Sequence, residues 1–576
     1  MKSDSKEPLA WQIKDANGKI ILTGMTTVFG LNKSSGESVH KADFSKLTTP
    51  SKEIVLVVNG EASHPFRIAD DIYTELKYDA LAYFYQNRSG IEIKPEYVQR
   101  ADLARPAGHP NETVTCFNKT DAKGNKWPGC DFELNVSGGW YDAGDHGRYV
   151  VNSGISVWTL LNLYERSLWI KDAKVPFADG TQTIPETNNN VNDLLDEVRW
   201  NVEFMMAMQV PNGKKVTVPE GDQSANLNQL KLTEIDASGL AFHKVADEKW
   251  TGMPLPPHKD TMDRAIFYPT TSATLNLAAT AAQCARIWKD IDPAFSGQCL
   301  TAAQRAWDAA NAHPEVLAYD NFTGSGPYGD TDLSDEFYWA GAELFITTGE
   351  AKYLKAIKAS PLYLVSPSDD KESSNGLYWG NLASAGTLSL ALVPNELPKN
   401  DILQARKNIQ KTADIYLKSV DEEGYNIPYT SEEYPWGSNS EILNNGIFLS
   451  YATDFTGDIK YLQAAADGMN YILGNNPLDK SYISGYGENA LQNPHHRFWS
   501  FQADNNSPKP APGAMSGGPN SINFSDPIAA TIKGKCIGQT CFVDDIGAWT
   551  LNEITINWNS PLVWITTVLD EKRLNQ

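Results

Sequence analysis

The chain has 576 residues, of which 71 are acidic and 49 basic, so its formal net charge is −22 at pH 7. Hydrophobic residues make up 41% and charged residues 21% of the sequence, which suits a large folded core and excludes a disordered chain. A mean hydropathy of −0.40 without long apolar runs excludes a membrane-spanning helix, and a pI near 4.9 argues against binding of nucleic acid or an anionic membrane.

The first 70 residues have the pattern of a β-rich region. Residues 11–14 and 20–23 flank an Asn-Gly dipeptide, which is typical of a hairpin turn, and a further apolar run spans residues 54–58. These strands are too few for a full sandwich, so we expect an opening strand to be absent. The pattern predicts a small all-β domain over residues 1–70 that carries no chemistry of its own.

From about residue 71 the apolar residues recur with a helical period. Their i, i+3, i+4, i+7 spacing predicts helices that each have one apolar face. The clearest stripes start at Leu195, Leu275, Phe337, Ile402 and Leu462. Long loops separate the helices, at residues 210–230, 321–332, 366–381 and 475–545. Because loops of this length are uncommon unless they are functional, we predict a helical scaffold whose loops carry the chemistry.

The six cysteines form three pairs that are close in sequence, namely Cys116/Cys130, Cys284/Cys299 and Cys536/Cys541. An even number in short loops favours three disulfides made in an oxidising compartment. For the first pair the alternative is a metal site completed by His109, Asp131 or His146. The chain starts without the apolar stretch of a signal peptide, so we expect an exported protein whose leader is missing here.

Two loop clusters carry groups suited to acid–base chemistry and polar recognition. Asp142 and Asp145 stand three residues apart in a glycine-rich run. Two such carboxylates can orient a water molecule and take its proton, or they can simply bond to the backbone of a turn. Further along the chain, His495 and Arg497 follow a proline. Their donors suit the binding of hydroxyl groups or of developing negative charge, or the pairing with surface acids.

Two further clusters contain acids in distinctive surroundings. Glu553 lies in sequence next to Trp549, Ile554 and other apolar residues. Such a neighbourhood raises the pKa of a carboxyl group, as a general acid requires near neutral pH, although a Glu near a helix start often only caps it. Residues 329–336 contain four acids before a predicted helix. They can hold Ca²⁺ or favour the helix N-terminus electrostatically, and their spacing is not that of an EF-hand.

These clusters resemble the signatures of the family 9 glycoside hydrolases, in the subgroup with an N-terminal immunoglobulin-like domain. Three long runs carry the resemblance, namely Ser137–Asp145, Ser481–Arg497 and Phe542–Ser560, and shorter matches are Asp335–Glu343 and Ala273–Asn276. The matches cover most of residues 71–570. They imply a mainly α fold: an (α/α)6-barrel catalytic domain at 71–576, with a cleft at one end, behind an immunoglobulin-like sandwich domain at 1–70.

The resemblance also implies roles for single residues. Glu553 is similar to the general acid, and Asp145 to the general base, of an inverting hydrolysis of β-1,4-glucosidic bonds. Asp142 is expected to help hold the attacking water, while His495 and Arg497 are expected to position the substrate. Such an inverting pair needs its carboxyl groups roughly 6.5–9.5 Å apart, to leave room for the water.

Metal sites are a further implication of the family resemblance. Asp332, Asp335 and Glu336 are similar to a structural calcium site, although the residues before Asp335 differ from the usual ligands. Asp544 is expected to play a supporting role as the second carboxylate of its signature. Some relatives bind zinc next to the first cysteine pair. Here Asp131 stands where a His sometimes follows, which weakens the case for zinc.

Aromatic residues are abundant, with 16 Trp, 24 Tyr and 20 Phe. Many belong to the helical stripes and are expected in the core. Loop aromatics near the chemistry offer flat faces on which the C–H faces of a sugar ring can pack. We therefore expect substrate subsites among Trp140, Tyr141, Trp379, Tyr434, Trp436, Trp499 and Trp549.

The expected substrate is a β-glucan such as cellulose, cellodextrins or mixed-linkage glucan. The enzyme is expected to be secreted or periplasmic and monomeric. Exo-acting cellodextrinases and exo-β-glucosaminidases would use the same carboxylates and remain alternatives. A non-catalytic carbohydrate-binding protein would have lost one of Asp142, Asp145 and Glu553, all of which are present. A barrel-shaped polysaccharide lyase would need a Tyr/His base and a basic cleft, contrary to the acidic composition.

Overall fold

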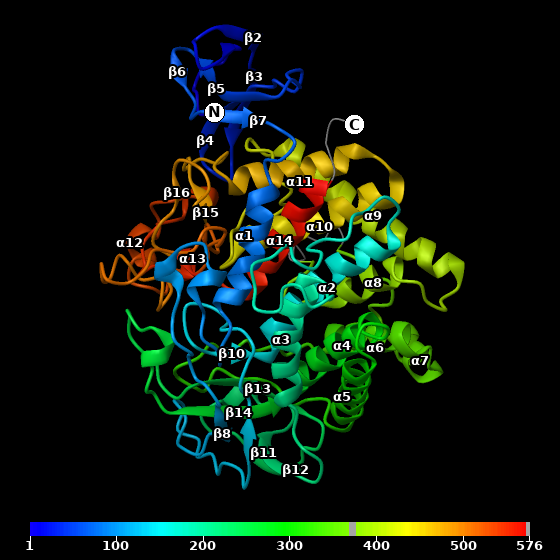
Figure 1. Cartoon of the computed structure of the whole chain (residues 1–576). Helices are drawn as coiled ribbons and strands as arrows, with labels where there is room; N and C mark the ends of the chain where they lie inside the picture. The colour runs from blue at the N-terminus through cyan, green and yellow to red at the C-terminus, as the bar shows by residue number, and fades with distance from the viewer. Residues whose placement is uncertain (368–375, 572–576) are drawn as a thin grey trace.

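The computed structural model describes residues 1–367 and 376–571. A small β domain precedes a much larger helical domain, as Figure 1 shows. Within these ranges, no helix combines the length and the apolar character needed to cross a membrane. The predicted loop at 366–381 falls partly outside the described residues.

The β domain contains the strands expected from the sequence. Its strands are β1 (Ala10–Lys14), β2 (Ile20–Met25), β3 (Thr27–Asn32), β4 (Glu37–Lys41), β5 (Ser51–Val58), β6 (Glu61–Ala62) and β7 (Phe66–Ile68). One sheet has the order β2-β1-β5-β6 with β7 paired to β5, and β3 pairs with β4 separately. Trp11, Ile13, Ile54 and Val58 form its core. The predicted strands at 11–14, 20–23 and 54–58 are thus confirmed.

The helical domain is a double ring. The inner helices are buried along nearly their whole length: α2 (Val150–Trp169), α4 (Thr271–Ile287), α6 (Ser334–Thr348), α8 (Ala383–Leu392), α10 (Ser438–Thr456) and α14 (Ile556–Glu571). The outer helices bury one side only: α1 (Thr74–Gln86), α3 (Asp193–Ala207), α5 (Pro293–Ala312), α7 (Ala351–Ala359), α9 (Lys399–Glu422) and α11 (Ile459–Ile472). Packing runs from α2 through α4 and α6 to α8, and α14 contacts both α10 and α2. This is the predicted (α/α)6 barrel.

Small residues allow the inner helices to approach one another closely. A Cβ added at Gly154 in α2 would lie 2.0 Å from Asn276 Oδ1 in α4, so only glycine fits at this crossing. The five predicted apolar stripes lie in α3, α4, α6, α9 and α11, which confirms them as helices. In α4 and α6 burial extends almost all round, rather than along one face, because a second ring of helices covers them.

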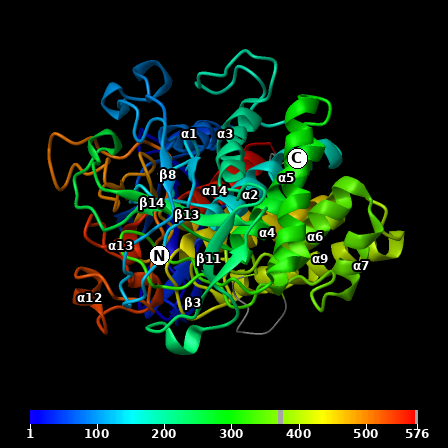
Figure 2. The ribbon, with the colours of Figure 1, turned by 90° about the horizontal axis from the view of Figure 1, so that it is seen from below.

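The segments that lead into the inner helices include a small sheet of β10 (Arg148–Tyr149), β13 (Ala241–Asp247) and β14 (Arg264–Thr270). It lies at the end of the barrel opposite the β domain (Figure 1), and from below it is seen beside α4 (Figure 2). β10 runs directly into α2, and β14 directly into α4.

Two of the predicted loops contain short elements of secondary structure. The loop 210–230 contains β11 (Lys215–Pro219), which pairs with β12 (Leu232–Asp236). The loop 475–545 contains β15 (Ser481–Ser484), β16 (Ala490–Leu491) and α12 (Ala529–Ile532).

Two of the three predicted disulfides are present. Cys116 bonds to Cys130 and Cys536 to Cys541, so the first pair is not a metal site. The prediction for Cys284 and Cys299 is wrong, because both are buried free thiols. These two residues face each other from α4 and α5 rather than from loops, and sequence spacing does not reveal whether two helical side chains have the orientation that a disulfide requires.

Thiol titration tests this assignment. Burial raises the pKa of Cys284 well above its usual value, and only a thiolate reacts rapidly with a disulfide reagent. We expect no fast reaction in the native protein and two thiols per chain after denaturation without reductant. The variant Cys284→Ser should then show a single thiol. A wild-type chain that shows none would contain the third disulfide after all.

Candidate active site

The first acidic motif forms a tight turn directly before β10 and α2. Gly139 has a φ of 73°, and a Cβ there would lie 2.6 Å from the Phe204 ring. Both the left-handed backbone and the close approach therefore require glycine. The main-chain oxygen of Asp142 accepts a hydrogen bond from the N–H of Ile556, at 2.9 Å. This bond ties the turn to the start of α14, the last inner helix.

Asp142 is a buried carboxyl group held by two donors. Its Oδ1 accepts a hydrogen bond from Asn152 Nδ2 at 2.9 Å, and its Oδ2 accepts one from the Tyr328 hydroxyl at 2.7 Å. Burial raises the pKa of Asp142 to about 7, the nearby charge of Asp145 adds to this, and the two donors oppose it. The side chain is therefore fixed in orientation.

Asp145 belongs to the same turn, is only 9% exposed, and has one oxygen engaged. Its Oδ2 accepts a hydrogen bond from the Tyr149 hydroxyl at 3.3 Å, and that hydroxyl accepts one from the Gly326 N–H at 2.9 Å. Lys244 is buried nearby and donates to the Gly326 carbonyl oxygen at 2.6 Å. Among the described residues, none donates a hydrogen bond to Asp145 Oδ1, which leaves it available to a water molecule.

Glu553 comes from the C-terminal signature and faces the same turn. The Gly144 N–H donates to its Oε1 at 3.4 Å. Burial raises the pKa of Glu553 well above its usual value, and the negative charges of Asp145 and Asp142 raise it further. The structure thus brings together the three carboxyl groups of Asp142, Asp145 and Glu553, each with distinct surroundings.

His495 and Arg497 both lie next to this turn. The Nδ1 of His495 bonds to the Ile546 carbonyl oxygen at 2.7 Å, and burial lowers the pKa of the imidazole to about 4, so the ring is neutral. Arg497 is buried, and its guanidinium donates to the carbonyl oxygens of Gly144 and Thr251, each at 2.9 Å. Arg497 thereby fixes the main chain beside Asp145. Direct contact of either side chain with substrate stays a prediction.

Asp544 stabilises the backbone of the residues that precede His495 in the sequence. Its carboxylate accepts hydrogen bonds from the N–H groups of Gln492 and Asn493, at 2.9 and 2.8 Å. Lys480 Nζ lies 2.6 Å from Oδ2. These contacts support the auxiliary role expected for this residue, since all of them stabilise the loop rather than face the other carboxyl groups.

Several aromatic residues expected as sugar platforms are core residues instead. Trp140 and Tyr434 have no exposed surface, and Tyr141 is only 3% exposed. The Trp140 indole donates to buried Glu197 at 2.8 Å, which fixes it in the core. Trp499 is also buried and stacks on a histidine. The prediction of direct sugar contact is therefore wrong for these four residues.

Three of the predicted platform residues keep accessible surface. Trp436 is 39% exposed, and Trp379 and Trp549 are partly exposed. Trp379 packs edge-on against Tyr328, the residue that holds Asp142, with ring centroids 5.3 Å apart. Sequence reasoning missed Tyr328, because nothing in its long loop marks it. Tyr149 could have been found, since it follows Asp145 by four residues at the start of a helix.

The acidic run before α6 forms a compact cluster of oxygen atoms. Carboxylate oxygens of Asp330, Asp335 and Glu336 all lie within 4.8 Å of one another. Glu336 is fully buried, and neither of its carboxyl oxygens has a hydrogen-bond partner among the described residues. Burial raises the pKa of Glu336 well above its usual value and that of Asp330 to about 6. Buried carboxyl groups without partners are what a bound cation would satisfy.

The sequence prediction for this cluster was partly misplaced. Asp335 and Glu336 belong to it, but the third member is Asp330 rather than Asp332. Asp332 is exposed, and its Oδ1 accepts a hydrogen bond from the Ser334 N–H at 3.0 Å, close to the start of α6. Two acids separated by one residue point in different directions here, so composition alone could not distinguish them.

The chain belongs to glycosyl hydrolase family 9. The family profile matches residues 73–566, and the profile of the cellulase N-terminal ig-like domain matches residues 1–63. These matches confirm the family and the immunoglobulin-like nature of the β domain, as expected from the sequence motifs.

Individual relatives cover nearly the whole chain. It is 44% identical over 606 residues to the "Cellulose 1,4-beta-cellobiosidase" of Acetivibrio thermocellus, covering 99% of this chain and 65% of that protein. It is 41% identical over 578 residues to "Endoglucanase C" of Cellulomonas fimi, covering 98% of this chain and 50% of that protein. A metagenome-derived family 9 endoglucanase structure matches with a TM-score of 0.80 and 29% identity, covering 99% and 94% of the two chains.

The distinction between aromatic residues of the core and exposed aromatic residues that could contact a sugar can be tested by substitution. Trp140→Ala should lower the free energy of unfolding by about 3–5 kcal/mol, because it empties a buried site and removes one hydrogen-bond donor from Glu197, which keeps only its pairing with Arg88. Trp436→Ala should change it by less than about 0.5 kcal/mol. Denaturant unfolding monitored by circular dichroism measures both. Equal losses in the two variants would contradict the assignment.

Proposed function

We propose that the protein hydrolyses β-1,4-glucosidic bonds in cellulose or related β-glucans, with inversion at the anomeric carbon. The main observation is that Asp142, Asp145 and Glu553 converge at one end of a family 9 barrel. The names of the two relatives, an endoglucanase and a cellobiosidase, support β-1,4-glucan as the substrate class. Since this chain spans only part of each relative, their activities carry over to it as part of this proposal.

Glu553 is the proposed general acid. Its raised pKa keeps the carboxyl group protonated near neutral pH, so that it can donate a proton to the glycosidic oxygen as the bond breaks. The group owes this state to burial and to the negative charges of Asp142 and Asp145. The leaving sugar is thereby released as a neutral alcohol.

Asp145 is the proposed general base, assisted by Asp142. Tyr149 holds one oxygen of Asp145, which directs the other at a water molecule on the opposite face of the sugar ring. Asp142, oriented by Tyr328 and Asn152, can accept the second hydrogen of the same water. Attack by this water while Glu553 protonates the leaving group inverts the anomeric configuration.

The acid and base assignments can be tested with two variants and two substrates. Glu553→Gln should lower kcat on cellodextrins by about 10²–10⁴-fold, since it removes proton donation. On an aryl cellobioside with a good leaving group the loss should be smaller, because such a group leaves without a proton. Asp145→Asn should be equally impaired on both substrates. Rates of reducing-sugar and phenol release measure the difference.

The matched control is Glu234→Gln, which changes an exposed glutamate of β12 and should keep wild-type rates.

The activity of the wild type should also fall as the pH rises through the pKa of Glu553, because only the protonated form donates. Proton NMR of the first product should show the α-anomer. A β-anomer, or wild-type activity of Glu553→Gln, would refute the mechanism.

An exo mode is a second candidate. The name of the 44% identical relative, a cellobiosidase, favours release of cellobiose from chain ends. The 41% identical relative is an endoglucanase, which favours internal cleavage. End-labelled cellohexaose separates the two modes, because an exo enzyme releases cellobiose from one end only. Chitosan oligomers in the same assay address the glucosaminidase alternative.

The acidic cluster before α6 is the proposed structural calcium site. Asp330, Asp335 and Glu336 supply hard oxygen ligands of the kind that Ca²⁺ prefers, and their unpartnered, buried oxygens fit a bound cation. Asp335 Oδ2 also accepts a hydrogen bond from the Leu382 N–H at 2.5 Å, at the start of α8. A cation here would therefore stabilise the junction of α6 and α8.

Calcium binding can be tested with a pair of similar substitutions. Removal of calcium by a chelator should lower the Tm of the wild type, because the buried carboxyl groups lose their compensating charge. Asp330→Asn should abolish most of the calcium-dependent increase in Tm, whereas Asp332→Asn should retain it, since Asn can also accept the hydrogen bond from the Ser334 N–H. Differential scanning calorimetry with and without Ca²⁺ measures this. An equal response of both variants would exclude Asp330 as a ligand.

We also propose that the protein acts outside the cytoplasm. Its two disulfides, Cys116–Cys130 and Cys536–Cys541, are typical of an oxidising compartment, and its proposed polymeric substrate is extracellular. A negatively charged surface suits a soluble enzyme acting on a neutral polysaccharide.

A further inference from the structure

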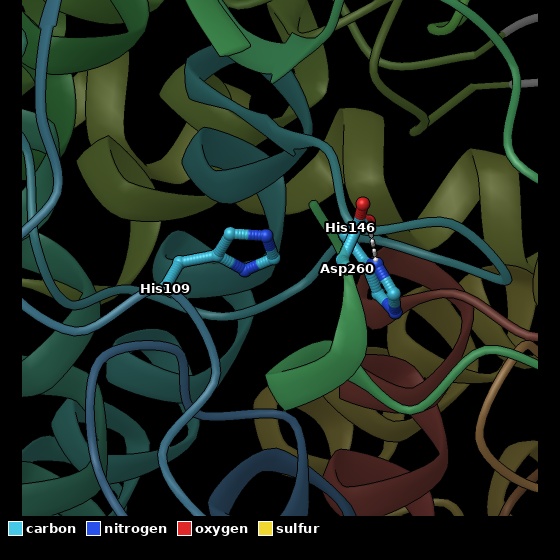
Figure 3. A group of neighbouring side chains, drawn as sticks. All are labelled: His109, His146 and Asp260. Carbon is cyan, nitrogen blue, oxygen red and sulfur yellow. Dashed lines mark hydrogen bonds and ion pairs between the residues drawn. The ribbon is translucent and has the colours of Figure 1, made fainter. Parts of the chain in front are cut away.

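We propose that His109, His146 and Asp260 form a second metal site, suited to a divalent transition-metal ion such as Zn²⁺. The three residues offer two imidazole nitrogens and one carboxylate oxygen within 4.8 Å of one another. In Figure 3 the ring of His109 points across a short gap toward the hydrogen-bonded pair of His146 and Asp260. His146 directly follows Asp145, so the site adjoins the turn that carries Asp142 and Asp145, called the catalytic turn below.

His109 presents a nitrogen that the protein does not otherwise use. Its Nδ1 lies 2.6 Å from the Tyr141 hydroxyl, while its Nε2 is buried without a hydrogen-bond partner among the described residues. When Nδ1–H donates to Tyr141, Nε2 carries the lone pair that a metal requires. Metal-binding histidines commonly donate their second ring nitrogen in this way, which fixes both tautomer and orientation.

His146 and Asp260 form the other half of the site. His146 Nδ1 lies 2.5 Å from Asp260 Oδ2, and the two side chains are only 4% and 1% exposed. Asp260 Oδ1 also accepts a hydrogen bond from the Met262 N–H at 3.0 Å, which fixes the carboxylate. An ion would replace the bond between the pair, and the imidazole proton would move to His146 Nε2, which is buried without a hydrogen-bond partner among the described residues.

Ligand chemistry selects the class of ion. Two imidazole nitrogens with one carboxylate suit Zn²⁺ and its neighbours, whereas Ca²⁺ prefers oxygen ligands alone. Zinc bonds of about 2.0–2.2 Å at a tetrahedral centre place ligand atoms about 3.4 Å apart, so ligand atoms that now lie up to 4.8 Å apart must approach by up to about 1.4 Å. Arg148 and Arg264 lie nearby, but both pair with Glu112, and Arg264 also pairs with Asp247.

The site would join three separate segments of the chain. His109 precedes β8 (Thr113–Thr115), His146 belongs to the catalytic turn, and Asp260 lies between β13 and β14. An ion would therefore restrain the turn that carries Asp145. This site shares no residue with the acidic cluster before α6, and the disulfide-bonded Cys116 and Cys130 do not take part in it.

Metal binding to the full chain tests the proposal without relying on activity. Protein treated with a chelator is returned to buffer with excess Ca²⁺, so that the acidic cluster is occupied, and titrated with Zn²⁺ by calorimetry. We expect one Zn²⁺ per chain. His109→Gln should weaken binding by more than about 100-fold, because even loss of a second-shell partner costs about 10–100-fold. The control His313→Gln changes a partly exposed histidine near Glu220 and should bind Zn²⁺ like the wild type.

Titration with Co²⁺ identifies the ligands. A tetrahedral site with nitrogen and oxygen ligands gives visible absorption bands without the near-ultraviolet band of thiolate, which would indicate binding at Cys284 and Cys299. If His109→Gln does not fold, as judged by circular dichroism, Asp260→Asn replaces it. Equal Zn²⁺ affinity of wild type and variant, no binding by the wild type, or a thiolate band would each overturn the proposal. Hydrolysis of cellodextrins is measured separately, so failure here leaves the proposed activity standing.

Discussion

The burial of three neighbouring carboxyl groups in one small space is the constraint on which the rest of the active site depends. Burial and neighbouring charge raise the pKa of Asp142 to about 7 and that of Glu553 well above its usual value. Burial thus disfavours the ionised form of both of these groups. The surrounding donors orient the carboxyl groups: Tyr328 holds Asp142, and Tyr149 holds Asp145.

Hydrogen bonds to the main chain, made between segments that are distant in sequence, hold these carboxyl groups in fixed positions relative to one another. The Ile556 N–H donates to Asp142, Arg497 donates to the Gly144 carbonyl oxygen, and the Gly517 N–H donates to the Glu553 carbonyl oxygen. Main-chain partners are less mobile than long side chains, so the acid and the base are placed by the barrel itself. The small residues that let the inner helices pack closely therefore contribute to the site as well as to stability.

Much of this arrangement could be predicted from the sequence, because it depends on local signals. Helical periodicity, short-range cysteine pairs and contiguous motifs each occupy one stretch of chain. The failures concern side-chain direction. Trp140 and Trp436 are both tryptophans beside motif residues, yet one donates to buried Glu197 and the other faces solvent. Likewise Asp330 enters the acidic cluster while Asp332 does not, since tertiary packing decides which side of a turn is covered.

The active site can form only after the ring of inner helices has closed. The ring closes where α2 meets α14, and Gly144 and Glu553, which hydrogen-bond there, are 409 positions apart. During synthesis the catalytic turn and most of the barrel emerge long before the last inner helix. The nascent chain therefore remains an open ring, with the future acid still inside the ribosome, and pairing over such a separation carries a large entropic penalty. Assembly of the active site is consequently one of the last steps of folding.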